Sequence, residues 1–153
     1  DKYMRFSLQK EASADTVRQI ISITESYTED FFTDNVPADT TNDLLFQSVA
    51  YLMNESEIVS FLVFTCLDGS PHITLFATKR EFRGKGYGTL LISQFSAYVE
   101  SIGFRQIEVM TVLPESKPVY YSTVAFYQGV GFEIINVYPF LWESGALKLR
   151  KSW

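Results

Sequence analysis

The spacing of apolar positions divides the chain into strand-like and helix-like segments. Alternating patterns, or short runs rich in β-branched and aromatic residues, predict strands at residues 3–8, 47–53, 58–66, 72–78, 106–112, 132–138 and 146–151. Apolar residues spaced by three and four predict helices at residues 17–27, 89–102 and 119–130. The segment 35–42 contains Pro37 among several Asp and Thr residues, which predicts a loop or a broken helix.

Short polar and glycine-containing segments separate these elements. Ser13 or Asp15 is placed to cap the first helix, and Asn54–Ser56 and Asp68–Pro71 carry turn signals. The resulting order is strand, helix, several strands, helix, strand, helix and two strands. This order predicts an α/β sandwich with a mixed sheet in three layers. Because the sequence contains neither a repeat nor a linker, we expect a single domain over residues 1–153.

The composition is typical of a soluble globular protein. With 46% apolar and 20% charged residues among 153, disorder and a collagen-like structure are excluded. One cysteine, Cys66, excludes an internal disulfide framework, and together with the one histidine, His72, it provides too few ligands for a structural zinc site. No apolar run approaches the ~20 residues of a membrane-spanning helix, and no secretion signal is found. We therefore expect a cytoplasmic protein without a membrane partner.

Charged side chains are unevenly distributed along the chain. Residues 1–58 carry 4 Lys or Arg and 11 Asp or Glu, whereas residues 59–153 carry 9 and 7. No Lys or Arg lies between Arg18 and Lys79, and acidic residues gather in the segment Glu25–Asp43. This acidic part is either a solvated face or a surface that attracts a cationic partner. A nucleic-acid binder would show a broad basic stripe, so we expect no nucleic-acid partner.

The most informative segment is the run Arg83-Gly84-Lys85-Gly86-Tyr87-Gly88, between a predicted strand and a predicted helix. Alternate glycines allow a tight turn and a close approach of the backbone to a ligand. The first amides of the helix lack intrahelical partners and, with the helix dipole, favour an anion. Arg83 and Lys85 add positive charge, and Thr89 offers a hydroxyl. The segment predicts a phosphate or pyrophosphate site. Its glycine spacing matches neither the dinucleotide-binding fingerprint nor the P-loop motif. The alternative is a glycine-rich turn that binds no ligand.

Two motifs resemble those of the GNAT superfamily of acyl-CoA N-acyltransferases. The family pattern of Gln or Arg followed at the third position by Gly and at the fifth by Gly or Ala is met by Arg83, Gly86 and Gly88. A second family motif, an Asn-x-x-Ala helix that ends in Tyr before Gly-Phe, is echoed by Thr123, Phe126, Tyr127, Gly131 and Phe132. Tyr120 stands where the family has Asn, and Thr123 where it has Ala, so the second motif departs from the pattern.

The resemblance implies a fold and a cosubstrate. The fold would be a three-layer GNAT-like α/β structure, with a central mixed, mostly antiparallel sheet, splayed parallel strands 4 and 5, and flanking helices. The cosubstrate would be acetyl-CoA, with its pyrophosphate at the glycine-rich turn and its pantetheine arm along the edge of the fourth strand, and no metal is implied. The residues implied to bind it are Phe76, Ala77, Thr78, Arg83, Gly84, Lys85, Gly86, Tyr87, Gly88 and Thr89.

The resemblance further implies an N-acetyltransferase in which an amine attacks the acetyl thioester directly, within a ternary complex. The family's usual acid, which protonates the departing thiolate, corresponds to Tyr127. An alkyl amine must lose a proton before it attacks, and His72 is the first candidate base because imidazole changes its protonation state near neutral pH. Glu108 on the adjacent strand and a water-mediated route are the alternatives. A backbone amide near Ala77 is a candidate donor to the oxyanion.

The sequence says less about the amine acceptor and the protein partners than about the cosubstrate. In such folds the acceptor side is built from the first helices and the loop after them, here the acidic segment Glu25–Asp43. This favours a cationic acceptor, such as a polyamine, an aminoglycoside-like amine, a lysine side chain or an N-terminal amine. A non-catalytic acyl-CoA sensor of the same fold and a nucleotide-binding module are the competing hypotheses. The aromatic-rich residues Tyr138, Phe140, Leu141 and Trp142 are expected in the core, with a homodimer surface or a lid as alternatives.

Overall fold

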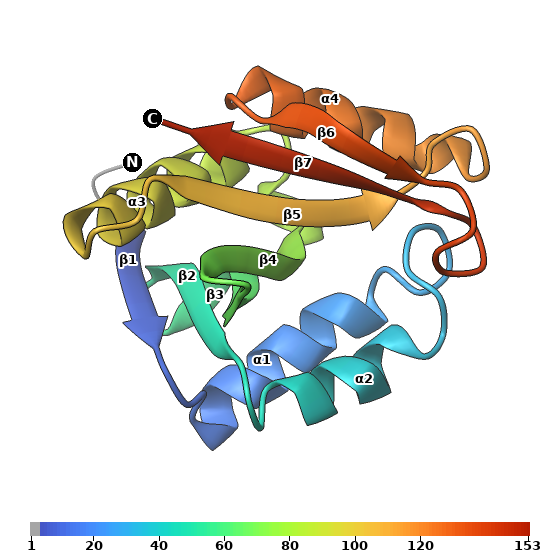
Figure 1. The fold of residues 1–153 in the computed structure, drawn as a ribbon. Coiled ribbons are helices and arrows are strands. Elements are labelled where there is room, and N and C mark those ends of the chain that lie inside the picture. Colours follow the sequence, from blue (N-terminus) through green and yellow to red (C-terminus); the bar gives the residue numbers. More distant parts are fainter. Residues whose placement is uncertain (1–3) are drawn as a thin grey trace. The chain divides into compact units, whose positions relative to one another are not determined.

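Seven strands and four α-helices are found in the part of the chain that the computed structural model describes, residues 4–153 (Figure 1). The strands are β1 (Met4–Gln9), β2 (Ser48–Asn54), β3 (Glu57–Leu67), β4 (Ser70–Thr78), β5 (Gln106–Val112), β6 (Glu133–Tyr138) and β7 (Ala146–Ser152). The helices are α1 (Ala14–Glu25), α2 (Val36–Asp43), α3 (Tyr87–Ser101) and α4 (Tyr121–Gly129), with short 3-10 helices η1 (Arg80–Phe82) and η2 (Pro118–Tyr120). The strands form one mixed sheet in the order β1-β2-β3-β4-β5-β7-β6, in which β4 and β5 are parallel. The predicted α/β class is confirmed.

The described residues form two compact units, and three elements contribute to both. The first unit contains residues 4–65 and 75–95, and the second contains residues 66–74 and 96–153. The elements β3, β4 and α3 therefore each pass from one unit to the other. The expected single domain over residues 1–153 stays a prediction.

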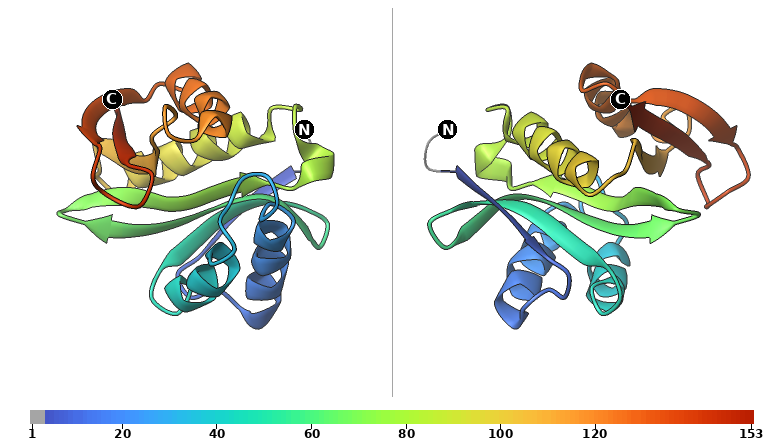
Figure 2. Two further views of the ribbon diagram at one scale, coloured as in Figure 1. Left: turned by 90° about the vertical axis from the view of Figure 1, so that its right-hand side faces the viewer. Right: turned by 60° about the vertical axis from the view of Figure 1, so that its left-hand side comes forward.

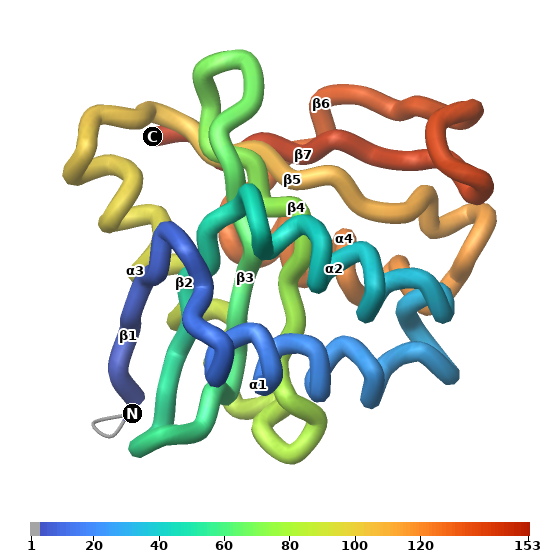
Figure 3. The backbone as a smooth tube through the Cα atoms, turned by 90° about the horizontal axis from the view of Figure 1, so that it is seen from below, coloured from blue at the N-terminus to red at the C-terminus, as the bar shows by residue number. Residues whose placement is uncertain are grey.

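Helices cover both faces of strands β1 to β3 in the first unit (Figure 2). Helices α1 and α2 lie side by side on one face (Figure 3). There Ile20 of α1 and Tyr27, just after that helix, join Phe61 of β3 in one buried cluster. The first turns of α3 lie on the other face, where the ring centroids of Phe95 and Phe64 are 4.8 Å apart. Because successive side chains of a strand point to opposite faces, β3 contributes to the core on both sides.

The second unit is built on antiparallel pairing of β5 with β7 and of β7 with β6. The outermost strand in the sheet order is β6. Figure 1 shows α4 alongside β6 and β7, and the ring centroids of Tyr127 in α4 and Phe132 before β6 are 5.3 Å apart. The start of β4 pairs in parallel with β5, and this register places His72 opposite Glu108. The strand pairing thus brings two candidate bases together.

The N-terminal elements agree with the sequence pattern. The expected start of the first strand at Tyr3 lies outside the described residues, and β1 begins at Met4. Ser13, rather than Asp15, caps α1, because the Ser13 hydroxyl oxygen accepts a hydrogen bond of 3.2 Å from the Thr16 amide.

The segment expected as a loop or a broken helix is a helix instead. Residues 36–43 form α2, and Pro37 lies in its first turn. At that position the missing amide proton removes no intrahelical hydrogen bond, so the proline starts the helix rather than interrupting it. None of the helices described is long and apolar enough to cross a membrane.

The aromatic segment after β6 corrects a second expectation. Phe140 is 96% exposed, and Leu141 and Trp142 are also exposed, whereas Tyr138 is half-buried. The three exposed residues occupy the connection between β6 and β7. The expectation that this segment belongs to the core was wrong for them; the homodimer surface and the lid stay predictions.

Candidate active site

The glycine-rich turn joins η1 to the start of α3 in the first unit. Gly84 and Gly86 have φ angles of 74° and 83°, a left-handed conformation that favours glycine. No atom lies within 4 Å of where a Cβ would stand at either residue, so the backbone angle, not crowding, requires glycine. The Leu90 amide donates to the Gly86 carbonyl at 3.0 Å, which places Gly86 at the helix start. The amides of the next residues have no carbonyl of the helix to pair with, as at any helix start, and their role as an anion cradle stays a prediction.

Four cationic side chains lie at or near this turn, and they differ in their partners. Lys79 forms an ion pair with Glu57, and the Arg80 guanidinium lies 2.5 Å from the Asp30 carboxylate. Arg83 and Lys85 are exposed, and within residues 4–153 neither forms an ion pair. These last two cations are therefore available to an external anion.

Tyr27 links α1 to this turn, a role that the sequence analysis missed. Its hydroxyl donates a hydrogen bond of 2.5 Å to the Thr78 carbonyl. The guanidinium carbon of Arg80 lies 4.3 Å from the Tyr27 ring centroid, and that of Arg83 lies 5.8 Å from it. Burial raises the pKa of Tyr27, so the hydroxyl stays protonated and remains a donor. Helical spacing predicted only that this side chain faces the core.

The end of β4 carries the residues expected along the pantetheine arm. Ala77 is buried, and Phe76 and Thr78 are half-buried. The Ser60 hydroxyl lies 2.8 Å from the Thr78 hydroxyl and 3.4 Å from the Ala77 carbonyl oxygen. The side chains of Ser60 and Tyr27 thus fix the carbonyls of Ala77 and Thr78. The role of these three residues toward a cosubstrate stays a prediction.

The remaining predicted cradle residues lie in the first turn of α3. Tyr87 is half-buried, and its ring meets that of Phe82 edge to face at a centroid distance of 6.1 Å. The Lys85 ammonium lies 5.8 Å from the same Phe82 ring. Gly88 is half-buried and Thr89 is exposed. Phe82 therefore packs against both Tyr87 and Lys85 of the turn. The sequence analysis did not identify this role of Phe82.

His72 and Glu108 form a buried pair in the second unit. His72 Nε2 lies 2.8 Å from Glu108 Oε1, and the two side chains are 7% and 6% exposed. They are register partners on β4 and β5, so the contact follows from the parallel pairing of the two strands. The first two base candidates are thus in direct contact, rather than independent alternatives.

Two cations of β7 complete this cluster, and the sequence analysis missed both. Arg150 donates to Glu108 Oε2 from Nε at 2.8 Å and from Nη2 at 2.5 Å, and Lys148 Nζ lies 3.7 Å from Glu108 Oε1. Burial acts to raise the pKa of Glu108, but the hydrogen bond from Arg150 and the charges of Lys148 and Arg150 outweigh it and hold that pKa below its ordinary value. Glu108 is consequently a carboxylate at neutral pH.

Tyr127, the predicted acid, lies on α4 among aromatic rings. It is 4% exposed, and its ring centroid lies 5.5 Å from that of Phe126. Burial, and secondarily the neighbouring Tyr120, raises the pKa of Tyr127 well above its ordinary value. Burial also raises the pKa of Tyr120 to about 12. Tyr127 is therefore protonated at neutral pH, the state that a proton donor requires.

The acidic segment of the first unit is only partly available to a cationic ligand. Asp30 is engaged by Arg80, and this hydrogen bond lowers the pKa of Asp30. Burial and the charge of Asp39 raise the pKa of Asp43. Glu29 and Asp34 are exposed, and among the described residues neither forms an ion pair. The negative charge offered to a ligand is therefore carried by fewer residues than the sequence indicates.

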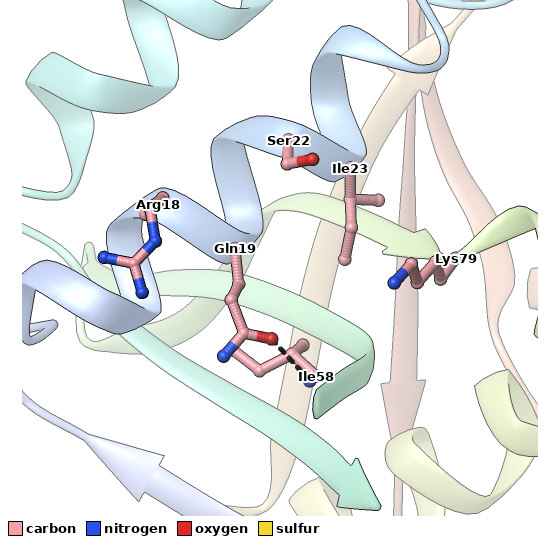
Figure 4. A pocket seen from close by; sticks show the side chains of 6 residues that line it. All are labelled: Arg18, Gln19, Ser22, Ile23, Ile58 and Lys79. Atoms are coloured by element: carbon pink, nitrogen blue, oxygen red, sulfur yellow. Dashed lines mark hydrogen bonds between the residues drawn. The ribbon is translucent and has the colours of Figure 1, made fainter. Parts of the chain in front are cut away.

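A cavity of about 270 Å³ lies beside α1 in the first unit (Figure 4). Its lining consists of Arg18, Gln19, Ser22, Ile23, Ile58 and Lys79. Gln19 closes one side of it, because its Oε1 accepts a hydrogen bond of 2.7 Å from the Ile58 amide. The two charged residues of the lining, Arg18 and Lys79, are both cationic, so this cavity does not suit the cationic acceptor predicted from the sequence.

A sequence model of the acetyltransferase (GNAT) domain matches residues 47–134 of the chain. The match covers more than half of the sequence and includes the glycine-rich turn, His72, Glu108 and Tyr127. A search of curated proteins gives no match.

Solved structures of similar fold include GNAT proteins from several organisms. A GNAT-family protein from Desulfovibrio desulfuricans has a TM-score of 0.84 at 14% sequence identity, covering 97% of this chain and 98% of that chain. PaiA N-acetyltransferase from Thermoplasma acidophilum, solved with coenzyme A, has a TM-score of 0.69 at 12% identity, covering 97% and 99%. A protein from Bacillus anthracis named as a streptothricin acetyltransferase, solved with acetyl-CoA, has a TM-score of 0.61 at 17% identity, covering 70% and 62%. At these identities the likeness concerns the fold.

Proposed function

The chain belongs to the GNAT family of acetyltransferases, and we propose that it transfers the acetyl group of acetyl-CoA to an amine by direct attack within a ternary complex. The family membership makes the chain an acyltransferase. The observation that carries the proposal is the glycine-rich turn at the start of α3, where helix amides and the exposed cations Arg83 and Lys85 lie together. A pyrophosphate is the ligand whose charge and size suit this cradle.

The proposed cosubstrate contacts follow the predicted residues. The turn from Arg83 to Thr89 would hold the pyrophosphate with its amides and cations, and Tyr87 would shield it. The end of β4, from Phe76 to Thr78, would hold the pantetheine arm. Two similar folds were solved with coenzyme A or acetyl-CoA, which supports this ligand class.

In the proposed reaction, His72 is the base and Tyr127 is the acid. The ammonium group of the acceptor loses one proton to His72, its nitrogen bonds to the acetyl carbon, and the C–S bond breaks as the thiolate takes a proton from Tyr127. The second proton of the nitrogen then passes to the Tyr127 phenolate and restores its hydroxyl. A backbone amide near Ala77 would donate to the oxyanion. The hydroxyl of Tyr127 is protonated at neutral pH, as a donor must be, although its raised pKa makes it a weak acid toward a thiolate.

The proposed acceptor is a cationic amine, such as a polyamine, an aminoglycoside-like amine, a lysine side chain or an N-terminal amine. The support is the acidic segment Glu25–Asp43, in which Glu29 and Asp34 stay exposed. A homodimer also remains a prediction; the exposed apolar residues Val137 and Phe140, on and after the outermost strand β6, support it.

Release of CoA thiol across a panel of amines tests this function, together with thermal shifts by acetyl-CoA, NAD and ATP. We expect stabilisation by acetyl-CoA alone and turnover with cationic amines in preference to neutral ones. Stabilisation by acetyl-CoA without turnover of any amine would favour a sensor. A larger shift with NAD or ATP would favour a nucleotide-binding module and overturn the proposal.

A further inference from the structure

We propose that Glu108 is a positioning residue rather than a base, and that Arg150 and Lys148 hold it in place so that it fixes the tautomer of His72. In this tautomer Nε2 carries the proton and donates to Glu108, and Nδ1 is the atom that takes the proton from the amine. The proposal rests on the proposed function only for this last step.

Strand register builds the cluster in one row across the sheet of the second unit. His72 on β4 is paired with Glu108 on β5, Glu108 is paired with Arg150 on β7, and Arg150 is paired with Glu133 on β6. Lys148 lies two residues before Arg150, which puts it on the same face of β7. Four strands therefore contribute one or two charged or titratable groups each to the row.

The contacts of Glu108 argue against a role as the base, because both of its carboxylate oxygens have partners. Oε1 faces His72 Nε2 at 2.8 Å and Lys148 Nζ at 3.7 Å, whereas Oε2 accepts both donors of the Arg150 fork, at 2.8 and 2.5 Å. A base needs an oxygen that reaches the substrate proton, and both oxygens of this carboxylate are engaged by His72, Lys148 and Arg150. The two cations instead stabilise the charged form of a buried carboxylate, which is costly without them.

A charged carboxylate determines which nitrogen of His72 holds the proton. An ionised carboxylate accepts hydrogen bonds but cannot donate one, so the 2.8 Å contact requires a proton on Nε2. In the neutral ring Nδ1 is then the acceptor. The same pattern, with a carboxylate holding one ring nitrogen while the other moves the proton, is used in catalytic triads.

The charge balance of the cluster predicts how it responds to substitution. Around His72 lie one carboxylate, Glu108, and two cations, Lys148 and Arg150; Glu133 faces Arg150 from β6. Removal of a cation leaves the carboxylate less compensated and favours the protonated imidazole, whereas removal of the carboxylate leaves two cations that disfavour it. The two kinds of variant should therefore act in opposite directions.

NMR of the histidine ring tests the proposal without an acceptor, because the chain contains one histidine. In protein labelled with 15N-histidine, we expect the tautomer protonated at Nε2. We expect the titration midpoint of the ring to rise by about one pH unit in Arg150→Met, less in Lys148→Met, and to fall by about one unit in Glu108→Gln. In Arg150→Lys, which keeps the positive charge, the titration midpoint should stay close to that of the wild type. Lys151→Met removes a cation on the other face of β7 and serves as the matched control.

Kinetics then separates the two proposals. If amines turn over, the acid limb of kcat at saturating substrates should move with the NMR midpoints, and Glu108→Gln should lose about tenfold to a hundredfold in kcat. The proposal is overturned if the wild-type ring is protonated at Nδ1, or if the Glu108 and Arg150 variants shift the midpoint in the same direction. The wild-type spectrum decides the tautomer even where a variant fails to fold. If the NMR spectra are as expected but no amine is turned over, the proposed function is overturned, whereas the role of Glu108 in fixing the tautomer of His72 stands.

Discussion

The glycine-rich turn of the first unit and the His72 cluster of the second unit differ in whether their charged side chains form ion pairs within the described residues. At the turn, Arg83 and Lys85 are exposed, and within residues 4–153 they form no ion pair. In the cluster, the buried Glu108 contacts His72 and two cations. The turn is proposed to receive an external anion, whereas the cluster compensates its own carboxylate. Variants at the two places should therefore separate cosubstrate binding from proton transfer.

The largest effect is expected from removing both exposed cations of the turn, Arg83 and Lys85. In Arg83→Gln with Lys85→Gln, KM for acetyl-CoA should rise by about 100-fold or more with little change in kcat, since each charge-assisted hydrogen bond contributes roughly 1.5–3 kcal/mol. Steady-state kinetics measures both constants. Lys10→Gln with Arg105→Gln, two exposed cations elsewhere, is the matched control. A fall in kcat with unchanged KM would contradict the assignment of these residues to binding.

Loss of the buried acid should produce the complementary pattern. In Tyr127→Phe, kcat should fall about tenfold while KM for acetyl-CoA stays constant, a modest loss because a thiolate is a fair leaving group. Tyr121→Phe changes an exposed tyrosine of the same helix and should leave both constants unaltered. An unchanged kcat in Tyr127→Phe would assign the hydroxyl to packing alone.

A smaller effect should distinguish the backbone of the cradle from glycine turns in general. Gly86 and Gly69 both have positive φ angles, 83° and 79°, with open space where a Cβ would stand. Each alanine variant should lose about 1–2 kcal/mol of unfolding free energy, because a side chain is strained in this conformation. Only Gly86→Ala should also raise KM for acetyl-CoA, by about fivefold. Urea unfolding and kinetics on the pair measure the two effects, and equal KM values would contradict the cradle.

The smallest effect concerns the stability of the buried cluster at low pH. The pKa of Glu108 is lowered in the folded protein, so the unfolded chain binds more protons as pH falls through the ordinary carboxyl range. The stability that Glu108 contributes above this range should be lost below it. Urea midpoints at about pH 6.5 and pH 4 should therefore differ less in Glu108→Gln than in the wild type, whereas Glu115→Gln, at an exposed position, should match the wild type.

Local features of the sequence predicted the elements and the turn. Strand β5 has the predicted bounds, because alternation and β-branched residues act within a few neighbours. The tight turn predicted from the glycine spacing is found as well, with positive φ angles at Gly84 and Gly86. The prediction for residues 36–43 was wrong for a local reason as well. Pro37 was interpreted as a helix breaker, but it lies in the first turn of α2, where proline is tolerated.

Contacts between distant segments were beyond the sequence pattern. Arg150 and Glu108 are 42 positions apart, and Tyr27 and Thr78 are 51 positions apart. Both contacts depend on strand register and helix placement, which apolar spacing does not determine. The sequence therefore suggested His72 and Glu108 as separate bases, although pairing of β4 with β5 makes them one unit. Phe140 shows the same limit, because its apolar character alone predicted burial.

The open charges of Arg83 and Lys85 have a consequence for the rate of encounter. Exposed cations attract a polyanion before contact, and salt screens this attraction over roughly 8 Å at physiological ionic strength. Acetyl-CoA should therefore associate more slowly as salt is added, while its dissociation changes little. Enzyme assayed in dilute buffer would then capture its cosubstrate faster than the same enzyme in the cell.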